Sequence, residues 1–318
     1  MRKVLLFVVF VSSAVSLFAQ QDPQFSQNMY IKLPVNPGYA GTEGSICGTL
    51  VYRNQWVGFP GTPTTTLFTI DAPIPILRGG AGLTVVNDKL GNFNFMHARG
   101  AYSYHISTNR GLVKLGVGLE VGIMQASVQH AWLTPSGNDG GPDVAIPNAA
   151  VKDLTYDVGL GIYYKLPKFY AGISTSHLPG SAQKLQATEF DYHVARHYYI
   201  LTGYDLQLGE SKFMLRPSVH VKTDTKITTF DANVNLLYDS KFWLGVSYRL
   251  KDAVVPHLGF AIPLTSTSGL KIGYAYDLGV SGLKSAHNNT HEVLLNYCIK
   301  FTPPVHVSTH RNPRFMGN

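Results

Sequence analysis

The sequence lacks any apolar run of the ~20 residues that a transmembrane helix requires. Its mean hydropathy is only +0.02, which argues against a helical membrane protein. Charged residues are also scarce, at 14% of the 318 residues, whereas aromatic residues make up 12%. Few charges, many Tyr and Phe, and 31 glycines are together typical of an outer-membrane β-barrel.

The sequence also lacks a block of consecutive basic residues. Its 26 Lys and Arg exceed its 19 Asp and Glu and give a formal charge of +7, but they are dispersed along the chain. This dispersal argues against nucleic-acid binding, for which basic residues cluster. We therefore expect the positive balance to serve contact with anionic lipid head groups or an acidic protein partner.

The first residues have the layout of a cleavable export signal. Arg2 and Lys3 precede an apolar run at 4–11, and Ser-Leu-Phe-Ala precedes Gln20. No cysteine follows the expected cleavage position, so a lipoprotein anchor is not indicated. We assign residues 1–19 to a signal peptide and expect the mature chain to start near Gln20 or Gln21.

Regular alternation of apolar with polar or small residues is the strongest feature that is present. Between 113 and 123 every second residue is Val, Leu or Ile, and the residues between them are Lys, Gly or Glu. Successive strand side chains point to opposite faces, so the large apolar groups share one face. We interpret the chain as all-β, a closed antiparallel transmembrane β-barrel with lipid outside and a polar lumen. The alternative is a soluble barrel or sandwich that is filled by the same apolar face.

The alternation recurs in about fourteen segments, an even number that is typical of bacterial barrels. We expect strands at 45–57, 63–73, 78–89, 93–107, 111–128, 153–166, 168–176, 194–207, 212–222, 228–238, 241–250, 254–261, 268–279 and 290–301. The long connections at 129–152, 177–193 and 280–289 then fall at one end of the barrel, and the short turns fall at the other.

These strands divide the mature chain into three parts. An irregular segment at 20–44 is periplasmic or plugs the barrel, the barrel occupies 45–301, and a tail at 302–318 lies in the periplasm. Both termini are therefore expected in the periplasm and the long connections outside the cell. Aromatic residues near strand ends are expected to form interfacial girdles. These residues are Trp56, Trp132, Tyr170, Tyr198, Tyr199 and Trp243.

The two cysteines lie at opposite ends of the predicted barrel sequence. Closure pairs the first strand with the last, so Cys47 and Cys298 become candidate cross-strand neighbours on the lumen-facing parity. In an oxidising compartment they would form a disulfide that fastens the seam. The alternative is two free thiols, because the shear of a barrel can displace neighbours by several residues.

No motif for catalysis, a cofactor or a metal is found. The chain has no G-x-S-x-G elbow and no P-loop. His287 and His291 are four residues apart, but on a strand that spacing separates them by about 13 Å. Asn138, Asp139 and Asp143 could offer oxygen ligands to calcium, although turn formation explains them equally well. We predict no enzymatic activity, no cofactor and no metal.

Several short stretches resemble the motifs of a known family. Near the N-terminus they read Asp22-Pro-Gln-Phe-Ser-Gln27, Pro34-Val-Asn-Pro-Gly-Tyr-Ala-Gly41 and Tyr52-Arg-Asn-Gln-Trp56. Later they read Ser174-Thr-Ser-His-Leu178, Thr290-His-Glu-Val-Leu294 and Asn312-Pro-Arg-Phe315. Together they resemble the PorP/SprF family of type IX secretion membrane proteins over almost the whole mature chain. One departure is Gly38, where the family usually carries alanine.

The resemblance implies a non-enzymatic outer-membrane barrel of the type IX secretion system, which in some bacteria serves gliding motility. Such a barrel secretes or anchors a surface adhesin with a type B C-terminal domain, or links the outer membrane to the periplasmic secretion ring. We expect the adhesin at the outside loops and a peptidoglycan-binding lipoprotein at the periplasmic end. The alternative is an outer-membrane porin or small-solute transporter.

Two sets of residues become candidates through this resemblance. The motif residues, with a functional or structural role, are Asp22, Pro23, Ser26, Asn36, Pro37, Tyr39, Arg53, Asn54, Trp56, His291 and Glu292. The tail residues Arg311, Arg314 and Phe315 are candidates for contact with a periplasmic partner.

Overall fold

The computed structural model describes residues 22–58, 61–108, 113–128, 151–180, 182–184, 191–280 and 289–300. Predictions on other residues lie outside this part of the chain. They concern the signal peptide, Trp132, Asn138, Asp139, Asp143, His287, Arg311, Arg314 and Phe315. Within the described residues, no helix has the length and apolar character that a membrane span needs. The two helices described are short 3-10 turns, η1 (Pro37–Tyr39) and η2 (Pro75–Leu77).

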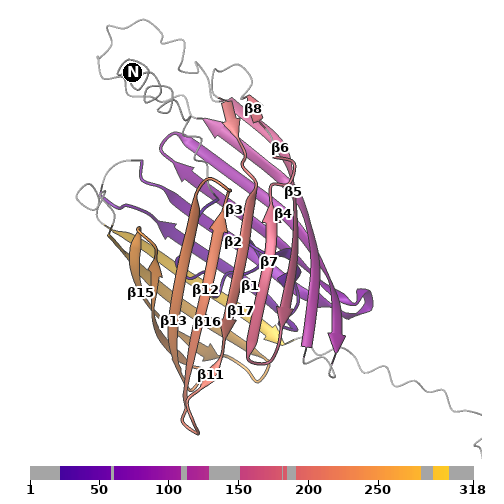
Figure 1. The fold of residues 1–318 in the computed structure, drawn as a ribbon, viewed down its shortest axis with the longest axis vertical. Coiled ribbons are helices and arrows are strands. Elements are labelled where there is room, and N and C mark those ends of the chain that lie inside the picture. The colour runs from indigo at the N-terminus through magenta and orange to yellow at the C-terminus, as the bar shows by residue number, and fades with distance from the viewer. Residues whose placement is uncertain are drawn as a thin grey trace, which may run out of the picture.

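Fourteen antiparallel strands form a closed barrel, as predicted (Figure 1). They are β1 (Ser45–Asn54), β2 (Thr64–Ile74), β3 (Gly79–Leu90), β4 (Phe93–Thr108), β5 (Val113–Val128), β6 (Val151–Lys165), β7 (Phe169–Ser176), β10 (His197–Tyr204), β12 (Phe213–Thr223), β13 (Thr228–Tyr238), β14 (Phe242–Arg249), β15 (Ala253–Pro263), β16 (Ser268–Gly279) and β17 (Thr290–Lys300). β1 pairs with β17, and β10 pairs with both β7 and β12. Every barrel strand therefore has two neighbours and the sheet has no free edge.

Two details differ from the predicted strands. The segment predicted as one strand at 194–207 is divided into β10 and the short β11 (Leu206–Gln207). The break falls at Asp205, whose carboxylate pairs with Arg216. Pro217 lies between the β10–β12 and β11–β12 pairings, and it has no backbone N–H to donate to the ladder. The connection predicted at 177–193 contains a small hairpin of β8 (Ala182–Lys184) and β9 (Asp191–His193).

The apolar parity faces outward. On β5, Val117, Leu119, Val121 and Ile123 are 47–55% exposed, whereas Glu120 on the opposite parity is 2% exposed. A soluble barrel filled by its apolar face would show the reverse, so this alternative is wrong. The outward residues instead form the surface that a membrane covers, and the charged residues line the lumen.

The connections define two ends of the barrel. We call the end that carries the connections 129–150, 177–196 and 280–289 the loop end, and the opposite end the turn end. The three long connections share one end, as predicted, but this end also carries the short connections 91–92, 224–227 and 250–252. β1 begins and β17 finishes at the turn end, where Ser45 pairs with Lys300.

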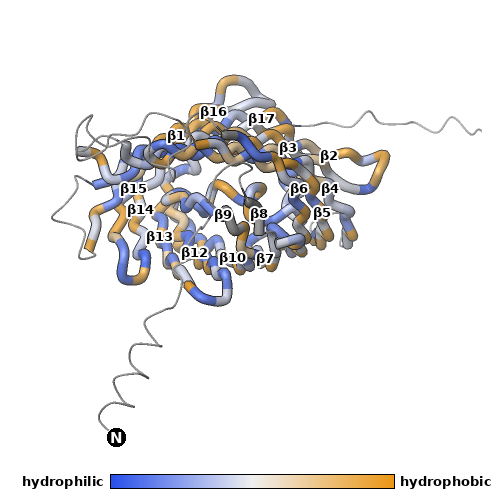
Figure 2. Tube along the Cα trace, turned by 90° about the horizontal axis from the view of Figure 1, so that it is seen from above, coloured by the Kyte–Doolittle hydropathy of each residue, from blue (hydrophilic) through white to orange (hydrophobic). Residues whose placement is uncertain are grey.

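Seen from above, the strands form a ring (Figure 2). Residues 22–44 bond to strands on several sides of this ring and therefore lie inside it, and we call them the plug. The plug begins near the loop end, where Asp22 contacts His177, and ends at the turn end, where Glu43 contacts Lys165. Its apolar side chains pack on inward-facing ones in a core of Phe25, Ile31, Val51, Leu67, Val86 and Leu294.

The plug runs from the loop end to the turn end. Its first described residue, Asp22, lies near the loop end, whereas Lys300, the last described residue of the barrel, lies at the turn end. The chain therefore crosses the whole lumen before β1 begins. Both termini lie outside the described residues, so their expected position in the periplasm stays a prediction.

Candidate functional site

The plug is bonded to strands around the circumference of the lumen. Gln24 and Asn28 donate to Asp231 on β13, and the backbone N atoms of Ser26 and Gln27 donate to Glu292 on β17. Further bonds reach the other side of the ring. They join Asn36 to Ile162 O, Gly38 O to Ser103, Gly41 N to Asp71, and Thr42 O to Lys114. The plug is thus held as part of the folded structure.

The turn at Asn36 to Gly38 packs against glycines of β5 and β6. Asn36 is fully buried, and its Oδ1 accepts a hydrogen bond of 2.9 Å from Gly38 N. A Cβ at Gly118 would lie 2.3 Å from Gly38 N, and one at Gly161 would lie 2.3 Å from Asn36 Oδ1. Only glycine in the wall leaves room for the plug backbone at Gly118 and for the Asn36 side chain at Gly161.

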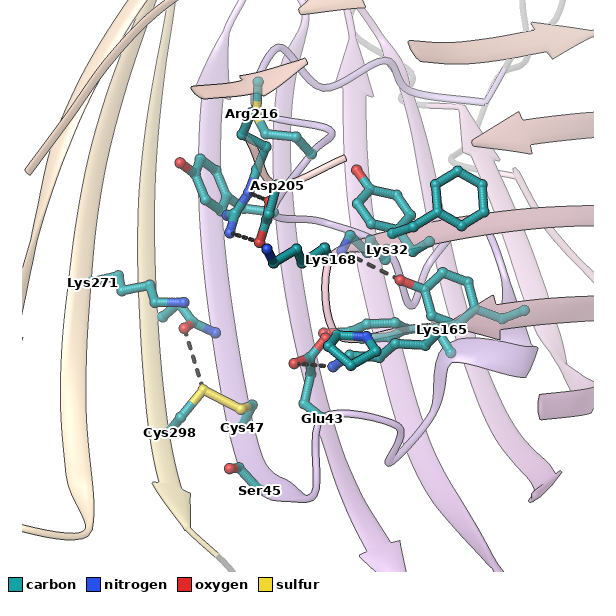
Figure 3. A pocket seen from close by; sticks show the side chains of 18 of the residues that line it. Lys32, Glu43, Ser45, Cys47, Lys165, Lys168, Asp205, Arg216, Lys271 and Cys298 are labelled. Atoms are coloured by element: carbon teal, nitrogen blue, oxygen red, sulfur yellow. Dashed lines mark hydrogen bonds and ion pairs between the residues drawn. A yellow bond between two sulfur atoms is a disulfide. The ribbon is translucent and has the colours of Figure 1, made fainter. Parts of the chain in front are cut away.

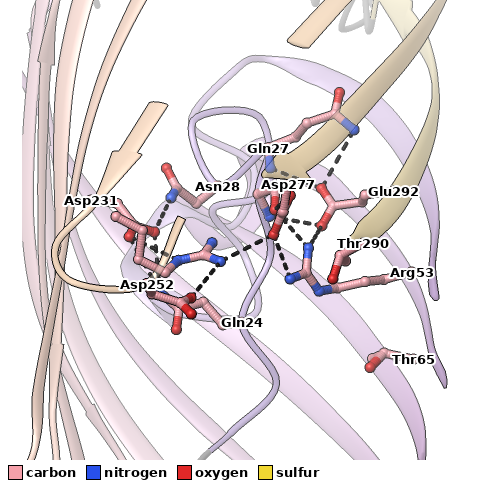
Figure 4. Close-up of polar contacts among 12 residues, drawn as sticks. Gln24, Gln27, Asn28, Arg53, Thr65, Asp231, Asp252, Asp277, Thr290 and Glu292 are labelled. Carbon is pink, nitrogen blue, oxygen red and sulfur yellow. Dashed lines mark hydrogen bonds and ion pairs between the residues drawn. The ribbon is translucent and has the colours of Figure 1, made fainter. Parts of the chain in front are cut away.

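A buried network of charges, which we call the loop-end network, holds the start of the plug near the loop end (Figure 4). Arg53 pairs with Asp277 at 2.7 Å and with Glu292 at 3.1 Å. Arg249 pairs with Asp277 at 3.2 Å and with Asp231 at 3.1 Å. All of these side chains are at most 5% exposed. Buried ions need such partners, so the network fixes the geometry of β1, β13, β14, β16 and β17 around the plug.

A second buried network supports the middle of the plug. Arg99 on β4 pairs with Glu120 on β5 at 3.0 Å and lies 3.8 Å from Asp157 on β6. Its Nη2 donates to the backbone oxygen of Pro34 at 3.3 Å. The wall charges are therefore paired with one another and with the plug backbone, as the low dielectric of the lumen requires.

The turn end carries a cavity of about 400 Å³ that we call the vestibule (Figure 3). Five cationic side chains and two carboxylates line it, so its lining carries a net charge of +3. They are Lys32, Lys165, Lys168, Arg216, Lys271, Glu43 and Asp205. Glu43 pairs with Lys165 and Asp205 pairs with Arg216, each through a contact of 2.5 Å. The vestibule is thus a basic recess at the turn end, where β1 begins and β17 ends.

Two ionisable residues of the plug lie at the vestibule. Burial lowers the pKa of Lys32 to about 8, and its Nζ lies 3.7 Å from the ring centre of Tyr170. Burial alone would raise the pKa of Glu43, but the charges of Lys165 and Lys32 hold it at about 2. Both groups therefore retain their charges at neutral pH.

We expect a pH-dependent contribution from Glu43. Because its pKa is depressed, its stabilisation is present above the ordinary carboxyl pKa of about 4.3 and is lost as the pH falls toward 2. Glu43→Gln should lower the free energy of unfolding by about 0.5–1 kcal/mol at pH 6, a small value because the pair is partly exposed. Urea unfolding of both proteins should show this difference vanish near pH 2, and a pH-independent difference would contradict the assignment.

The disulfide between Cys47 and Cys298 is present in the structure, on directly paired positions of β1 and β17. It joins two residues that are 251 positions apart in the sequence. Replacing both cysteines with serine should cost about 2–4 kcal/mol, because the unfolded chain loses a constraint. Urea unfolding should measure this loss, and mass spectrometry should find two alkylated thiols only after reduction. Two labels before reduction would contradict the disulfide.

The candidate motif residues fall into three groups. Ser26, Arg53 and Glu292 meet in the loop-end network, where Arg53 Nη1 also donates to Ser26 Oγ at 2.6 Å. The other plug residues among them, Asp22, Pro23, Asn36, Pro37 and Tyr39, lie in the lumen along the plug. The motif residues therefore hold the plug against the wall.

The other three motif residues lie at the loop end. Asn54 pairs in register with His291, and the backbone N of Trp56 donates to Thr290 Oγ1. His291 is on the outward parity and bonds the Tyr274 hydroxyl at 2.7 Å. It therefore lies apart from the lumen network that contains its neighbour Glu292.

Several predicted girdle residues lie in the lumen instead. Trp243 and Tyr199 are buried, and Trp243 packs on Tyr30 of the plug with ring centres 5.0 Å apart. Tyr170 packs on Lys32 in the vestibule. Their strand parity turns them inward, so the girdle prediction is wrong for these three residues. Tyr198, on the outward parity, is 40% exposed.

Sequence reasoning missed the wall residues that hold the plug. Asp231, Arg249 and Asp277 complete the loop-end network, and Arg99 with Glu120 forms the second one. All of them lie on the inward parity of predicted strands. The sequence did carry a signal for them. Opposite charges at inward-facing positions of neighbouring strands indicate a buried ion pair.

The closed sheet, outward apolar face and polar lumen define an outer-membrane β-barrel with an internal plug. Residues 17–297 match the family described as type IX secretion system membrane protein PorP/SprF, and the chain belongs to this family. The resemblance found in the sequence is thus confirmed.

Solved structures of low sequence identity share the fold. The CymD monoaromatic hydrocarbon channel matches with a TM-score of 0.52 and 12% identity, covering 87% of this chain and 93% of that chain. The Ralstonia pickettii toluene transporter TbuX matches with a TM-score of 0.53 and 12% identity, covering 84% and 92%. A comparison with curated proteins finds no match.

Proposed function

We propose that this chain is a non-enzymatic barrel of the type IX secretion system that secretes or anchors a surface adhesin with a type B C-terminal domain. The turn end faces the periplasm and reaches a lipoprotein or the secretion ring, and the loop end faces outward. The observation that carries the proposal is the occupied lumen of a PorP/SprF family barrel. A lumen held shut by bonds to its own plug suits an anchor better than a passage for solutes.

The connections at the loop end would bind the secreted adhesin. These are 129–152 and 177–193, and the second carries the β8–β9 hairpin. Deleting either connection in a chain that still folds should release the adhesin from the cell surface into the medium. Immunoblots of cells and medium measure this, with barrel folding checked by heat-dependent mobility on gels. Unchanged surface retention after both deletions would contradict this part of the proposal.

The vestibule would bind an acidic segment of the periplasmic partner. Its excess of cations favours a negatively charged ligand, and such attraction raises the rate of association. Lys168→Glu with Lys271→Glu should reduce co-purification of the partner at least about tenfold, because both attractive charges become repulsive. Lys89→Glu, an exposed change at the loop end, is the matched control and should leave co-purification unchanged. Equal loss in both variants would count against a role of the vestibule.

The competing function is a porin or small-solute transporter. The shared fold with a hydrocarbon channel and a toluene transporter favours it. Vesicles that contain the protein distinguish the two functions. Uptake of small sugars or toluene above the rate of protein-free vesicles would support transport, whereas an anchor with a plugged lumen should add no uptake.

A further inference from the structure

A compact group of metal-ligand side chains lies where the plug begins. Among the described residues, Asp22, His177 and His197 each offer one ligand atom, and these atoms lie within 4.8 Å of one another. Asp22 belongs to the plug, His177 follows β7, and His197 begins β10. The group therefore joins the start of the plug to two strands of the wall.

The histidines are oriented as metal ligands usually are. His197 Nδ1 donates to the carbonyl oxygen of Ala195 at 3.0 Å, since a carbonyl can only accept. This leaves His197 Nε2 with a free lone pair, and this buried atom has no hydrogen-bond partner within the described residues. His177 Nδ1 lies 3.1 Å from a carboxylate oxygen of Asp157, a contact without hydrogen-bond geometry, and its Nε2 lies 2.8 Å from Asp22 Oδ1. A metal-bound histidine characteristically has its other nitrogen on a carboxylate or a backbone carbonyl.

The distances suit a small dication after a slight adjustment. His177 Nε2 lies 2.8 Å from Asp22 Oδ1. Ligands about 2.0–2.2 Å from a tetrahedral zinc ion lie roughly 3.3–3.5 Å apart, so this pair would open and His197 would approach.

The charges around the group also leave a place for a cation. Three carboxylates face two permanent cations, so one negative charge is left over. The carboxylates are Asp22, Asp157 and Glu120, and the cations are Arg99 and Lys222. A proton on His177 meets that remaining charge when no metal is bound, and Zn²⁺ in its place would leave a net charge of +1. Two imidazoles and a carboxylate form a borderline donor set that favours zinc over calcium or magnesium.

We propose that Asp22, His177 and His197 bind one Zn²⁺ ion, which fastens the start of the plug to β7 and β10. The sequence conceals the site because its three residues lie on segments far apart in the chain and meet only once the barrel closes around the plug. The site does not depend on the proposed role in secretion.

The test measures zinc binding to the purified, folded, full-length barrel without a polyhistidine tag. After treatment with a chelator, the wild-type protein should take up one Zn²⁺ per chain, measured by elemental analysis and by competition with a chromophoric chelator. Co²⁺ in place of zinc should give the visible absorption of a tetrahedral site, a signature that surface histidines do not produce.

The control variants use a second buried histidine. His197→Gln should weaken zinc binding at least about 100-fold, more than the loss of an outer partner costs. His220→Gln is the matched control, because His220 is also buried and its Nε2 also has no partner within the described residues, but it is outside the group. It should bind zinc as the wild type does. Absence of stoichiometric zinc in the folded wild type, or equal binding by both variants, would overturn the proposal.

Discussion

Replacing Arg53 with methionine should cost about 3–5 kcal/mol of stability, the loss expected when one partner of a buried ion pair is removed. Asp277 and Glu292 would keep their charges in the lumen, with side chains at most 5% exposed. Ser26 of the plug would also lose the hydrogen bond from Arg53. Urea titration of the barrel in lipid vesicles should show an earlier midpoint, followed through heat-dependent mobility on gels.

Two companion variants make this result specific. Arg78→Met removes an exposed guanidinium next to η2 and should change stability by less than about 0.5 kcal/mol. Adding Glu292→Gln to Arg53→Met should recover part of the loss, because one uncompensated charge is removed. Equal stability of Arg53→Met and wild type would show that the buried network does not hold the barrel and plug together.

Gly118→Val should displace the plug. The new Cβ would lie 2.3 Å from Gly38 N and from Pro37 C, both backbone atoms that no side-chain rotation can move. We expect a loss of about 3 kcal/mol, at the upper end of the cost of overpacking, together with protease cleavage within residues 22–44. Mass spectrometry of the digest of the folded barrel measures the second effect.

Gly100→Val is the matched control on the neighbouring strand β4. A Cβ at Gly100 meets nothing closer than 3.9 Å, and this residue lies on the outward parity. Valine there should leave stability and protease resistance almost unchanged. If Gly118→Val were as resistant as Gly100→Val, the close packing of the plug on β5 would be wrong.

The wall of the barrel could be predicted from the sequence because its rules are local. Alternation located the fourteen barrel strands to within a few residues, and the even number brought the first strand beside the last. The same reasoning placed Cys47 opposite Cys298, where the structure has a disulfide. The split at Asp205 was missed, because it depends on Pro217 of the neighbouring strand, and alternation within one segment does not show which residues lie opposite it.

The plug could not be predicted in the same way. Residues 22–44 have no period, and their partners lie far away in sequence, since Ser26 bonds Glu292 across 266 positions. The family motifs named Ser26, Arg53 and Glu292 without showing that they meet. Trp243 was assigned to a girdle because its position near a strand end was weighed without its inward parity.

The central claim is that the chain closes its own lumen with residues 22–44. Conductance of the purified wild-type protein in planar lipid bilayers tests it most directly. We expect insertion without a steady ohmic current, because the plug is bonded to strands around the lumen. A stable open channel in the folded, full-length protein would contradict it.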